Sequence, residues 1–496
     1  MKNKYKVFFV SAEVAPFASN SELGEVAGAL PKLLKDMGHE MRMMMPNYRA
    51  VNERKYILRD VIRLKDMSIQ MDGQVLKANG KSAFLPDSKV QIYFLDYKPY
   101  FDRSSLFSDG SQNKGYADNA ERAIFFCRGC LETLKLLHWQ PDIIHCNDWQ
   151  TSLIPYFLKT VLRDDPFFKN TRVLLSFHDS SQQGVFSADI IRKAGLAENH
   201  LALGSPGEFM GKFNFLKAGI ATADLTTTVS ETYAEEILTE KDIAQGLEKF
   251  LREKRPKIVG VLNGIDYIFW NPETDAHLAA PYSAANLSGK LANKQALLKH
   301  YGLEANHRQP VVGVINSTRE EKGIGLIVEA FDKIIASGVK LIIIGGGDEK
   351  YQSLLTKLAK KHPRNAAVSF RRDEAQAHLL LAGADMVLMP SKVEPCGLYQ
   401  MIAMAYGTIP IVRAVGGLAE TVSDYNPSTE RGVGFVFNKF TVAEMMQALN
   451  RSVKLYDDGK KWQHVMKNTM KQIFSLQSSA EKYTKLYQKI GSLSRK

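Results

Sequence analysis

The segment from Pro390 to Val422 constrains the fold of this chain more than any other part of the sequence. It follows Asp385–Met389, a short apolar run of the kind that forms a buried parallel strand. A helix is predicted over Cys396–Tyr406 and a second strand over Thr408–Arg413, after which Gly416-Gly417 begins another helix. Two strand-to-helix crossings therefore follow each other directly. Alternating strands and helices predict an α/β fold built on parallel sheets.

Small residues stand where each of these predicted helices begins. The start of a helix carries unpaired amides and the positive end of the helix dipole, and glycine lets a ligand approach the backbone closely. Glu394 stands at one crossing and Gly416-Gly417-Leu418 at the other. A carboxylate beside two anion-favouring helix ends suits a sugar attached to a diphosphate. One glycine-rich turn would be weak evidence, because many α/β proteins bind nothing there, but two in tandem with E-P-C-G-L between them are more specific.

Length and composition bound the class of protein. A chain of 496 residues exceeds the size at which one hydrophobic core usually stops growing, so two domains are predicted. The hydrophobic content of 45% and the charged content of 24% are ordinary for a globular protein. The net charge of +12 comes from Lys and Arg spread along the chain, with no zinc finger or RNP motif, so nucleic acid is not a predicted partner. No apolar run reaches membrane-spanning length, so no membrane is predicted either.

Cysteine usage and the N-terminus indicate the compartment. The chain has too few cysteines for a disulfide framework, namely Cys127, Cys130, Cys146 and Cys396. The first two have redox-motif spacing but lie within a predicted helix, Asn119–Leu137, and are interpreted as buried packing. The apolar run Lys6–Val10 is too short for a signal peptide. A soluble cytoplasmic protein is predicted, and no metal site, because no convincing cluster of metal ligands occurs in the sequence.

The N-terminal half opens with a strand-helix-strand pattern. A strand is predicted over Lys4–Glu13, an amphipathic helix over Leu23–Gly38 and a strand over Glu40–Met45. Residues 51–117 are irregular, with several short strand signals. Pro141–Trp149 contains a strand that ends in a polar cluster, at the end of a parallel strand where ligands bind.

Strand signals continue up to the domain boundary and beyond it. Val173–Ser176 is predicted to be a strand, and Thr228–Ser230 is interpreted as the last strand of the first domain with a helix cap. Asn263-Gly264 is a strong turn signal, and the change of domain is placed around it. The second domain is predicted to begin with a helix and two strands, over Lys290–Tyr301, Pro310–Ile315 and Lys340–Ile344.

Three of these motifs resemble the signature of one family. They are Pro390-Ser-Lys-Val-Glu-Pro-Cys-Gly-Leu398, Tyr406-Gly-Thr-Ile-Pro-Ile-Val-Arg413 and Gly416-Gly-Leu-Ala419. The sequence is similar here to the bacterial glycogen synthases and plant starch synthases, which are family-five glycosyltransferases. The resemblance runs essentially from Lys6 to Tyr487.

The resemblance implies an architecture and a reaction. It implies two Rossmann-like domains that face each other across a cleft, the GT-B architecture, over residues 1–258 and 259–474, with a C-terminal helix in 475–496 that returns to the first domain. The implied reaction transfers glucose from ADP-glucose, a nucleotide sugar, to the non-reducing end of an α-1,4-glucan with retained configuration. It implies neither a cofactor nor a metal ion.

The resemblance also implies site residues. The catalytic ones are Glu394, which would hold glucose hydroxyls and stabilise charge near the anomeric carbon, Lys322, which would stabilise departing ADP, and His178, which would contact glucose. The substrate-binding ones are Asp148, Asn263, Arg319, Arg372, Cys396, Gly397, Leu398, Gly416, Gly417 and Leu418.

Two family motifs are altered in this chain. Where the family reads K-T-G-G-L-A-D-V, this sequence has Ser19-Asn-Ser-Glu-Leu-Gly-Glu-Val26, so the lysine that touches the donor diphosphate is missing and Glu22 adds a carboxylate. Where the family reads S-R-L-T-x-Q-K-G, this sequence has Asn316-Ser-Thr-Arg-Glu-Glu-Lys-Gly323. Ser317 takes the arginine position, and Arg319 follows two residues later, either as compensation, which is favoured, or as a solvated charge.

Three functions therefore remain open. An active glycogen synthase with a rebuilt phosphate site is favoured, because Glu394, His178, Lys322 and the glycine turns persist. The missing family cations leave open a catalytically weak or inactive glucan-binding relative. Arg372 replaces a family tyrosine that lies against adenine, and although a guanidinium also stacks on a base, this leaves open a glucosyltransferase that uses another nucleotide sugar.

Overall fold

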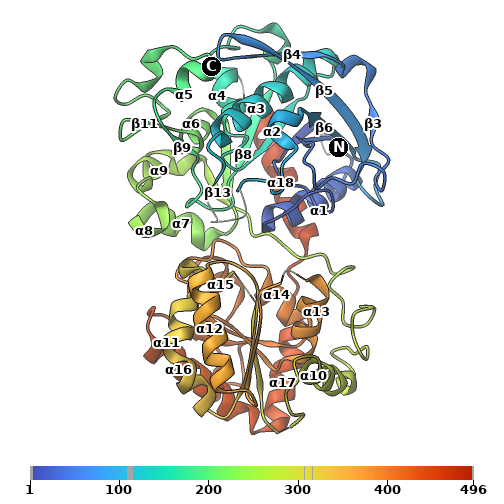
Figure 1. Cartoon of the computed structure of the whole chain (residues 1–496), viewed down its shortest axis with the longest axis vertical. Coiled ribbons are helices and arrows are strands. Elements are labelled where there is room, and N and C mark those ends of the chain that lie inside the picture. The colour runs from blue at the N-terminus through green and yellow to red at the C-terminus, as the bar shows by residue number, and fades with distance from the viewer. Residues whose placement is uncertain (1–3, 109–114, 307, 316, 372, 494–496) are drawn as a thin grey trace. The chain divides into compact units, whose positions relative to one another are not determined.

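The structure is a computed structural model that describes residues 4–108, 115–306, 308–315, 317–371 and 373–493. Within these residues the chain forms two compact α/β units (Figure 1). Unit 1 comprises Met1–Val229, Ala234–Val261 and Leu476–Lys496, and unit 2 comprises Ser230–Tyr233 and Leu262–Ser475. The C-terminal segment thus belongs to the unit in which the chain begins.

Unit 1 is built on a sheet to which the described residues contribute ten strands, in the order β13-β12-β8-β7-β1-β2-β6-β5-β3, with β4 paired to β5. The strands from β13 to β6 run parallel, and β3, β4 and β5 are antiparallel. Their bounds are β1 (Lys6–Val10), β2 (Glu40–Pro46), β3 (Arg59–Asp60), β4 (Met67–Met71), β5 (Gln74–Phe84), β6 (Gln91–Asp96), β7 (Ile143–Asn147), β8 (Arg172–Ser176), β12 (Leu225–Thr228) and β13 (Ile258–Gly260).

The central strands of this sheet are buried along almost their whole length. β1 reads Lys-Val-Phe-Phe-Val and β7 reads Ile-Ile-His-Cys-Asn, and all but the first residue of β1 are buried, as expected for parallel strands covered by helices. The main helices are α1 (Glu22–Asp36), α3 (Asn119–Leu136), α4 (Leu153–Lys159), α6 (Phe215–Thr222), α7 (Glu231–Thr239), α9 (Glu248–Lys254) and α18 (Leu476–Gly491). α18 packs against α1, and its Tyr487 hydroxyl lies 2.7 Å from Nδ1 of His145 on β7.

Unit 2 is a doubly wound parallel sheet. Its strand order is β16-β15-β14-β17-β18-β19, so the chain starts in the middle, moves to one edge and then returns to build the other half. The strands are β14 (Val311–Ile315), β15 (Lys340–Ile344), β16 (Ala366–Ser369), β17 (Met386–Met389), β18 (Ile409–Arg413) and β19 (Phe435–Phe437). The helices are α10 (Ser288–His300), α11 (Ile324–Ala336), α12 (Glu349–Lys361), α13 (Glu374–Gly383), α14 (Tyr399–Ala405), α15 (Gly416–Thr421), α16 (Val442–Tyr456) and α17 (Gly459–Met470).

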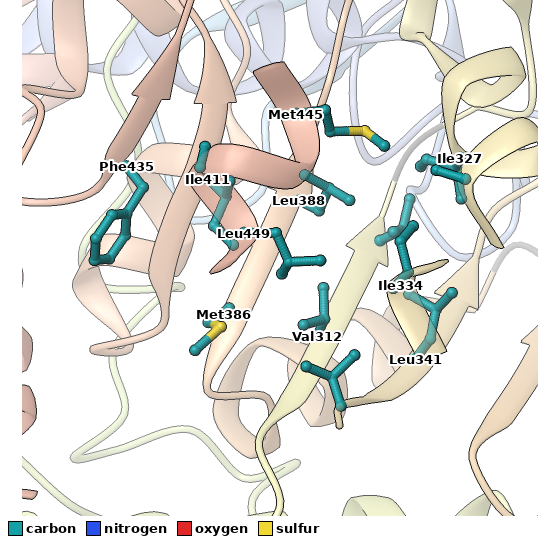
Figure 2. Packing of buried hydrophobic residues seen from close by; sticks show 14 of the residues in the cluster. Val312, Ile327, Ile334, Leu341, Met386, Leu388, Ile411, Phe435, Met445 and Leu449 are labelled. Carbon is teal, nitrogen blue, oxygen red and sulfur yellow. The ribbon is translucent and has the colours of Figure 1, made fainter. Parts of the chain in front are cut away.

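The core of unit 2 lies where α11 and α16 cover the sheet (Figure 2). Val312 and Leu388 come from neighbouring strands, and Ile334 and Leu449 from the two helices, and each is at most 1% exposed. Burying one such aliphatic side chain contributes roughly 1.5–3 kcal/mol. This packing holds the strand ends, and the loops that leave them, at set positions.

Three sequence expectations need correction. The helix predicted from Cys396 begins only at Tyr399, because Gly397 has a φ of +70°, outside the helical region. The last strand of unit 1 does not lie at Thr228–Ser230, because β13 follows later in the chain and pairs with β12. With only three residues, β13 is too short to be predicted as a strand from the sequence. Residues 51–117 contain more regular structure than expected, because β5 alone spans 11 residues. The Asn-Gly pair within β5 is typical of a turn and interrupts the alternating pattern from which a strand is predicted.

The cysteine interpretation is confirmed. All four thiols are free and buried, and Cys127 Sγ donates a hydrogen bond to the Gln150 carbonyl at 3.2 Å. In the part of the chain that the structure describes, no helix combines the length and the apolar character needed to cross a bilayer.

Candidate active site

Both sheets reverse their strand order at one point, and such a switch point is where ligands bind in open α/β sheets. In unit 2 the switch lies between β14 and β17, and the loops after these strands carry Lys322 and Glu394. In unit 1 it lies between β1 and β7, and Asp148 directly follows β7. Lys322, Glu394 and Asp148 therefore stand at the two switch points.

Glu394 is the central carboxylate of the unit 2 switch point, and its side chain is only 2% exposed. Lys322 Nζ donates a hydrogen bond to Oε1 at 2.5 Å, and Ser391 Oγ donates to Oε2 at 2.8 Å. A buried carboxylate is tolerated only when it is paired and hydrogen-bonded, and both conditions are met here. The two loops together hold a negative charge at a set position. Ser391 was not predicted, although it stands in the same Pro-Ser-Lys-Val-Glu run.

A close backbone contact fixes the loop that carries Lys322. Gly323 has a φ of +74° and ends the short 3₁₀ helix Glu320–Lys322. A Cβ at this position would lie 1.9 Å from the Pro390 carbonyl oxygen, so only glycine lets the two loops come this close. The approach brings the lysine to the carboxylate.

Gly416 and Gly417 join the two strand-to-helix crossings. A Cβ on Gly416 would lie 1.9 Å from the Glu394 carbonyl oxygen, and one on Gly417 would lie 1.9 Å from the Cys396 carbonyl oxygen. The Gly417 amide donates to the Glu394 and Pro395 carbonyls, both at 3.2 Å. In this structure the Gly417 amide therefore holds the crossing together, and Leu418 is fully buried beneath it.

Asn263 is a buried amide whose hydrogen-bonding groups are unused. It is 1% exposed, and neither its Oδ1 nor its Nδ2 has a hydrogen-bond partner among the described residues. Its backbone carbonyl accepts a long hydrogen bond, 3.9 Å, from Cys396 Sγ. An unsatisfied buried amide costs about 1–3 kcal/mol, so Asn263 is a candidate ligand-binding residue.

In the loop after β14, the guanidinium of Arg319 lies at the protein surface. Arg319 is 46% exposed and lies 3.5 Å from Glu321, as a solvated ion pair. Thr318 is buried, and its hydroxyl has no hydrogen-bond partner in the described part of the chain, which makes it a polar group that the sequence analysis missed. Asn316 and Arg372 lie outside the described residues.

Asp148 is the central carboxyl group of unit 1. Its φ of +58° is in the left-handed region, and Oδ1 accepts the His178 backbone amide at 2.6 Å. Burial raises the pKa of Asp148 to about 8, with the nearby Asp179 and Glu13 carboxylates acting in the same direction and the amide bond opposing them. This shift favours the protonated form of the carboxyl group, which can donate a hydrogen bond.

Two histidines lie at the same end of this sheet. Both ring nitrogens of His178 lack a hydrogen-bond partner among the described residues, and burial lowers its pKa to about 4. His145 is fully buried, and its nitrogens lie 2.7 Å from the Ser176 and Tyr487 hydroxyls. Burial, with a contribution from His178, lowers its pKa to about 3. His145 is structural, whereas His178 presents a neutral imidazole with unused groups.

The altered loop after β1 is hydrogen-bonded to a buried acidic residue. Glu13 is 4% exposed, and its Oε2 accepts the Asn20 amide at 2.5 Å. Ser19 Oγ donates to the Ser21 carbonyl at 3.2 Å. Glu22 begins α1, where the helix dipole favours a carboxylate, so its charge serves helix formation.

The sequence of this chain is similar to known proteins over almost its whole length. The sequence profile of the starch synthase catalytic domain matches residues 6–253, and that of the group 1 glycosyl transferases matches residues 299–472. The glycogen synthase of Chlorobium phaeovibrioides is 39% identical over 489 residues, which cover 99% of each chain, and that of Geotalea daltonii is 40% identical over 482 residues, which cover 97% of this chain and 98% of the relative. This chain belongs to the glycogen synthase and starch synthase family. It is a glucosyltransferase.

Solved structures agree with this assignment. The catalytic domain of starch synthase IV from Arabidopsis thaliana, solved with ADP and acarbose, aligns with a TM-score of 0.91 at 31% identity and covers 99% of this chain and 100% of its own. Sucrose-phosphate synthase from Thermosynechococcus elongatus aligns with a TM-score of 0.59 at 16% identity over the same shares, which shows the fold alone. The predicted family and its GT-B fold of two Rossmann-like domains are confirmed.

In this glycogen synthase relative, the lowered pKa values of His145 and His178 predict how stability depends on pH. The folded pKa of His145 lies below the unfolded value of 6.5, so the unfolded state binds the additional proton, and stability falls as pH decreases from 6.5 towards 3. We expect a loss of roughly 1.4 kcal/mol per pH unit from this residue. The lowered pKa of His178 acts in the same direction. The raised pKa of Asp148 acts in the opposite direction, because its contribution to the stability of the fold decreases as pH increases from 4 to 8.

Urea unfolding of the native chain and of His145→Gln between pH 4.5 and 7.5 measures this contribution. The variant should show a pH slope that is shallower by about one proton below pH 6.5. His464→Gln, at an exposed position on α17, should keep the native slope. Equal slopes for native chain and His145→Gln would contradict the assignment.

Proposed function

We propose that this chain transfers glucose from ADP-glucose to the non-reducing end of an α-1,4-glucan such as glycogen, with retention of configuration. The observation that carries the proposal is Glu394, a buried carboxylate held by Lys322 and Ser391 at the switch point of unit 2. The relatives named glycogen synthase and the starch synthase IV structure, which was solved with ADP and acarbose, support the choice of donor and acceptor.

Unit 2 supplies the contacts to the nucleotide and the leaving group in this proposal. A retaining transfer needs a stabilised leaving group and an acceptor held on the same face of the sugar. An ammonium carries three donors, so Lys322 can serve the Glu394 carboxylate and a phosphate oxygen together. Such preorganised charge is usually a large catalytic contribution. Asn263, with its unsatisfied buried amide, binds the nucleotide side, and the Glu394 carboxylate stabilises positive charge that develops at the anomeric carbon.

Unit 1 supplies the contacts to the sugar. The neutral imidazole of His178 both donates and accepts, which suits a glucose hydroxyl. The protonated Asp148 carboxyl group donates a further hydrogen bond at neutral pH. Both ring nitrogens of His178 are shielded from solvent, so their bonds to glucose are stronger than they would be in water.

The last part of the proposal concerns the role of Arg319 at the diphosphate. The family arginine is absent at Ser317, and Arg319 pairs with exposed Glu321 in the absence of donor. Surface ion pairs of this kind contribute little, about 0–1 kcal/mol, so the guanidinium is released at low cost when a diphosphate offers two more charges. We propose that Arg319 then binds the diphosphate and compensates for Ser317.

The proposal needs no cofactor beyond the donor and places the reaction in the cytoplasm. Four reduced, buried thiols fit a reducing compartment. Neither nucleic acid nor a membrane takes part in it.

The test is glucose transfer to glycogen by the purified chain, with ADP-, UDP- and GDP-glucose compared at equal concentrations. We expect the highest kcat/KM with ADP-glucose. Arg319→Ala in the same assay should lower kcat/KM by about tenfold or more if its guanidinium meets the diphosphate, since hydrogen bonds to charged groups contribute about 1.5–3 kcal/mol.

Each other outcome identifies an alternative. Transfer with UDP- or GDP-glucose in place of ADP-glucose would make this a transferase for another donor, the reading that Arg372 favours. Binding of maltooligosaccharides without turnover of any donor would make it an inactive glucan-binding relative. Unchanged kinetics in Arg319→Ala would mean that its charge stays solvated.

A further inference from the structure

Three potential metal ligands that the transfer reaction does not use come together in unit 2. They are His277, Glu374 and His378, and one ligand atom from each lies within 4.8 Å of the other two. His277 and Glu374 are exposed, whereas His378 is 1% exposed. The group therefore has one buried, fixed member and two members whose side chains are open to solvent.

The fold brings these residues together from two segments. Glu374 and His378 are the first and fifth residues of α13, and this spacing puts both side chains on one face of the helix. His277 comes from the loop after Trp270, and its amide donates to Asp275 Oδ1 at 2.9 Å, which fixes the loop backbone. The His277 and His378 rings lie 4.6 Å apart, measured between centroids.

The surroundings of His378 define which nitrogen is available. Asp275 Oδ2 lies 2.6 Å from His378 Nδ1, and the Tyr406 hydroxyl donates to the same oxygen at 2.6 Å. A carboxylate only accepts, so Nδ1 carries the proton and Nε2 keeps its lone pair. Trp270 stacks on the imidazole with the ring centroids 4.1 Å apart, which prevents the ring from turning.

This lone pair is not used within the described part of the chain. Nε2 of His378 is buried and has no hydrogen-bond partner among those residues. A buried acceptor without a partner costs free energy and indicates a missing ligand. The arrangement in which a carboxylate holds one histidine nitrogen while the other faces a ligand is the usual support of a metal-bound histidine.

We propose that His277, Glu374 and His378 bind a divalent transition-metal ion of the zinc class, with Asp275 as the residue that orients His378. Two imidazoles and one carboxylate suit Zn²⁺, Co²⁺ or Ni²⁺, whereas Mg²⁺ and Ca²⁺ prefer oxygen ligands alone. Ligand atoms of a tetrahedral zinc site lie about 3.3 Å apart. The exposed His277 and Glu374 side chains close the remaining gap by rotation around the fixed His378, and water takes the fourth position.

The consequence of binding is a cross-link between the loop 270–282 and the start of α13. Because the ligands come together only in the folded state, a bound ion stabilises unit 2 by RT ln(1 + c/Kd), where c is the concentration of free ion. None of the three ligands is among the residues assigned to glucose transfer, so this inference does not rest on the proposed function.

The test uses the untagged full-length chain after removal of metal with a chelator. Titration with Co²⁺ should produce the visible absorption bands of a four-coordinate ion at one equivalent, and Zn²⁺ should displace them. His277→Ala and Glu374→Gln, both at exposed positions, should each weaken Co²⁺ binding by about 100-fold, and Asp275→Asn by roughly 10–100-fold. His464→Ala, a surface histidine on α17, should bind like the native chain.

Thermal unfolding supplies an independent measure. Zn²⁺ should raise the unfolding temperature of the native chain and of His464→Ala, but not that of His277→Ala. Absence of the bands, or equal affinity in native chain, His277→Ala and Glu374→Gln, would overturn the proposal.

Discussion

Replacing Glu394 with alanine is expected to lower kcat for glucose transfer from ADP-glucose by about 10²–10³-fold. The carboxylate is 2% exposed and bonded through both oxygens to Lys322 and Ser391, and an alanine side chain can make neither of these bonds. Its removal deletes the negative charge at the switch point and leaves the lysine without its carboxylate partner. Steady-state kinetics with glycogen as acceptor measure the effect.

Controls separate charge from packing. Glu394→Gln keeps the volume and loses the charge, and it should fall close to the alanine variant. Glu329→Ala, at an exposed position on α11, should retain native kcat. Because Lys322 and Glu394 act together, the double variant should lose much less than the product of the two single losses. Native-like kcat in a folded Glu394→Ala chain would contradict the role assigned to this carboxylate.

Gly417→Ala is expected to destabilise unit 2 by about 3 kcal/mol and to reduce transfer strongly. The added methyl group would lie 1.9 Å from the Cys396 carbonyl oxygen and 2.7 Å from its Cα, and both are backbone atoms that no rotamer change can move. The two crossings would have to separate, which displaces Glu394. Denaturant unfolding gives the stability, and kcat gives the displacement.

Gly459→Ala is the matched control. This glycine begins α17, and a Cβ there meets no atom within 4 Å among the described residues. Since neither Gly417 nor Gly459 has a positive φ, the two substitutions differ in steric contact and not in backbone strain. We expect Gly459→Ala to match or slightly exceed native stability. Equal effects of the two substitutions would show that the crossings tolerate separation.

Much of the fold could be predicted because it depends on local sequence patterns. Short apolar runs became β1, β7, β14 and β17, and the glycine pair at Gly416-Gly417 does begin a helix. Glu394 and Lys322 could be identified because each stands in a contiguous motif. Two local features were not predicted. The strand signal of the three residues of β13 is too weak, and the positive φ of Gly397 keeps Cys396 out of the helix that was predicted to begin there.

The α/β class, the family and the main carboxylate and cation follow from residue types at short spacings, so they can be read from the sequence alone. Which polar groups lack partners depends on the folded arrangement: Asn263, Thr318 and the two ring nitrogens of His178 have none among the described residues. The folded arrangement also decides that His277 meets Glu374 and His378, and that burial raises the pKa of Asp148 while it lowers that of His178. Desolvation and hydrogen-bond satisfaction depend on every neighbour in space, and these neighbours come from segments far apart in the chain.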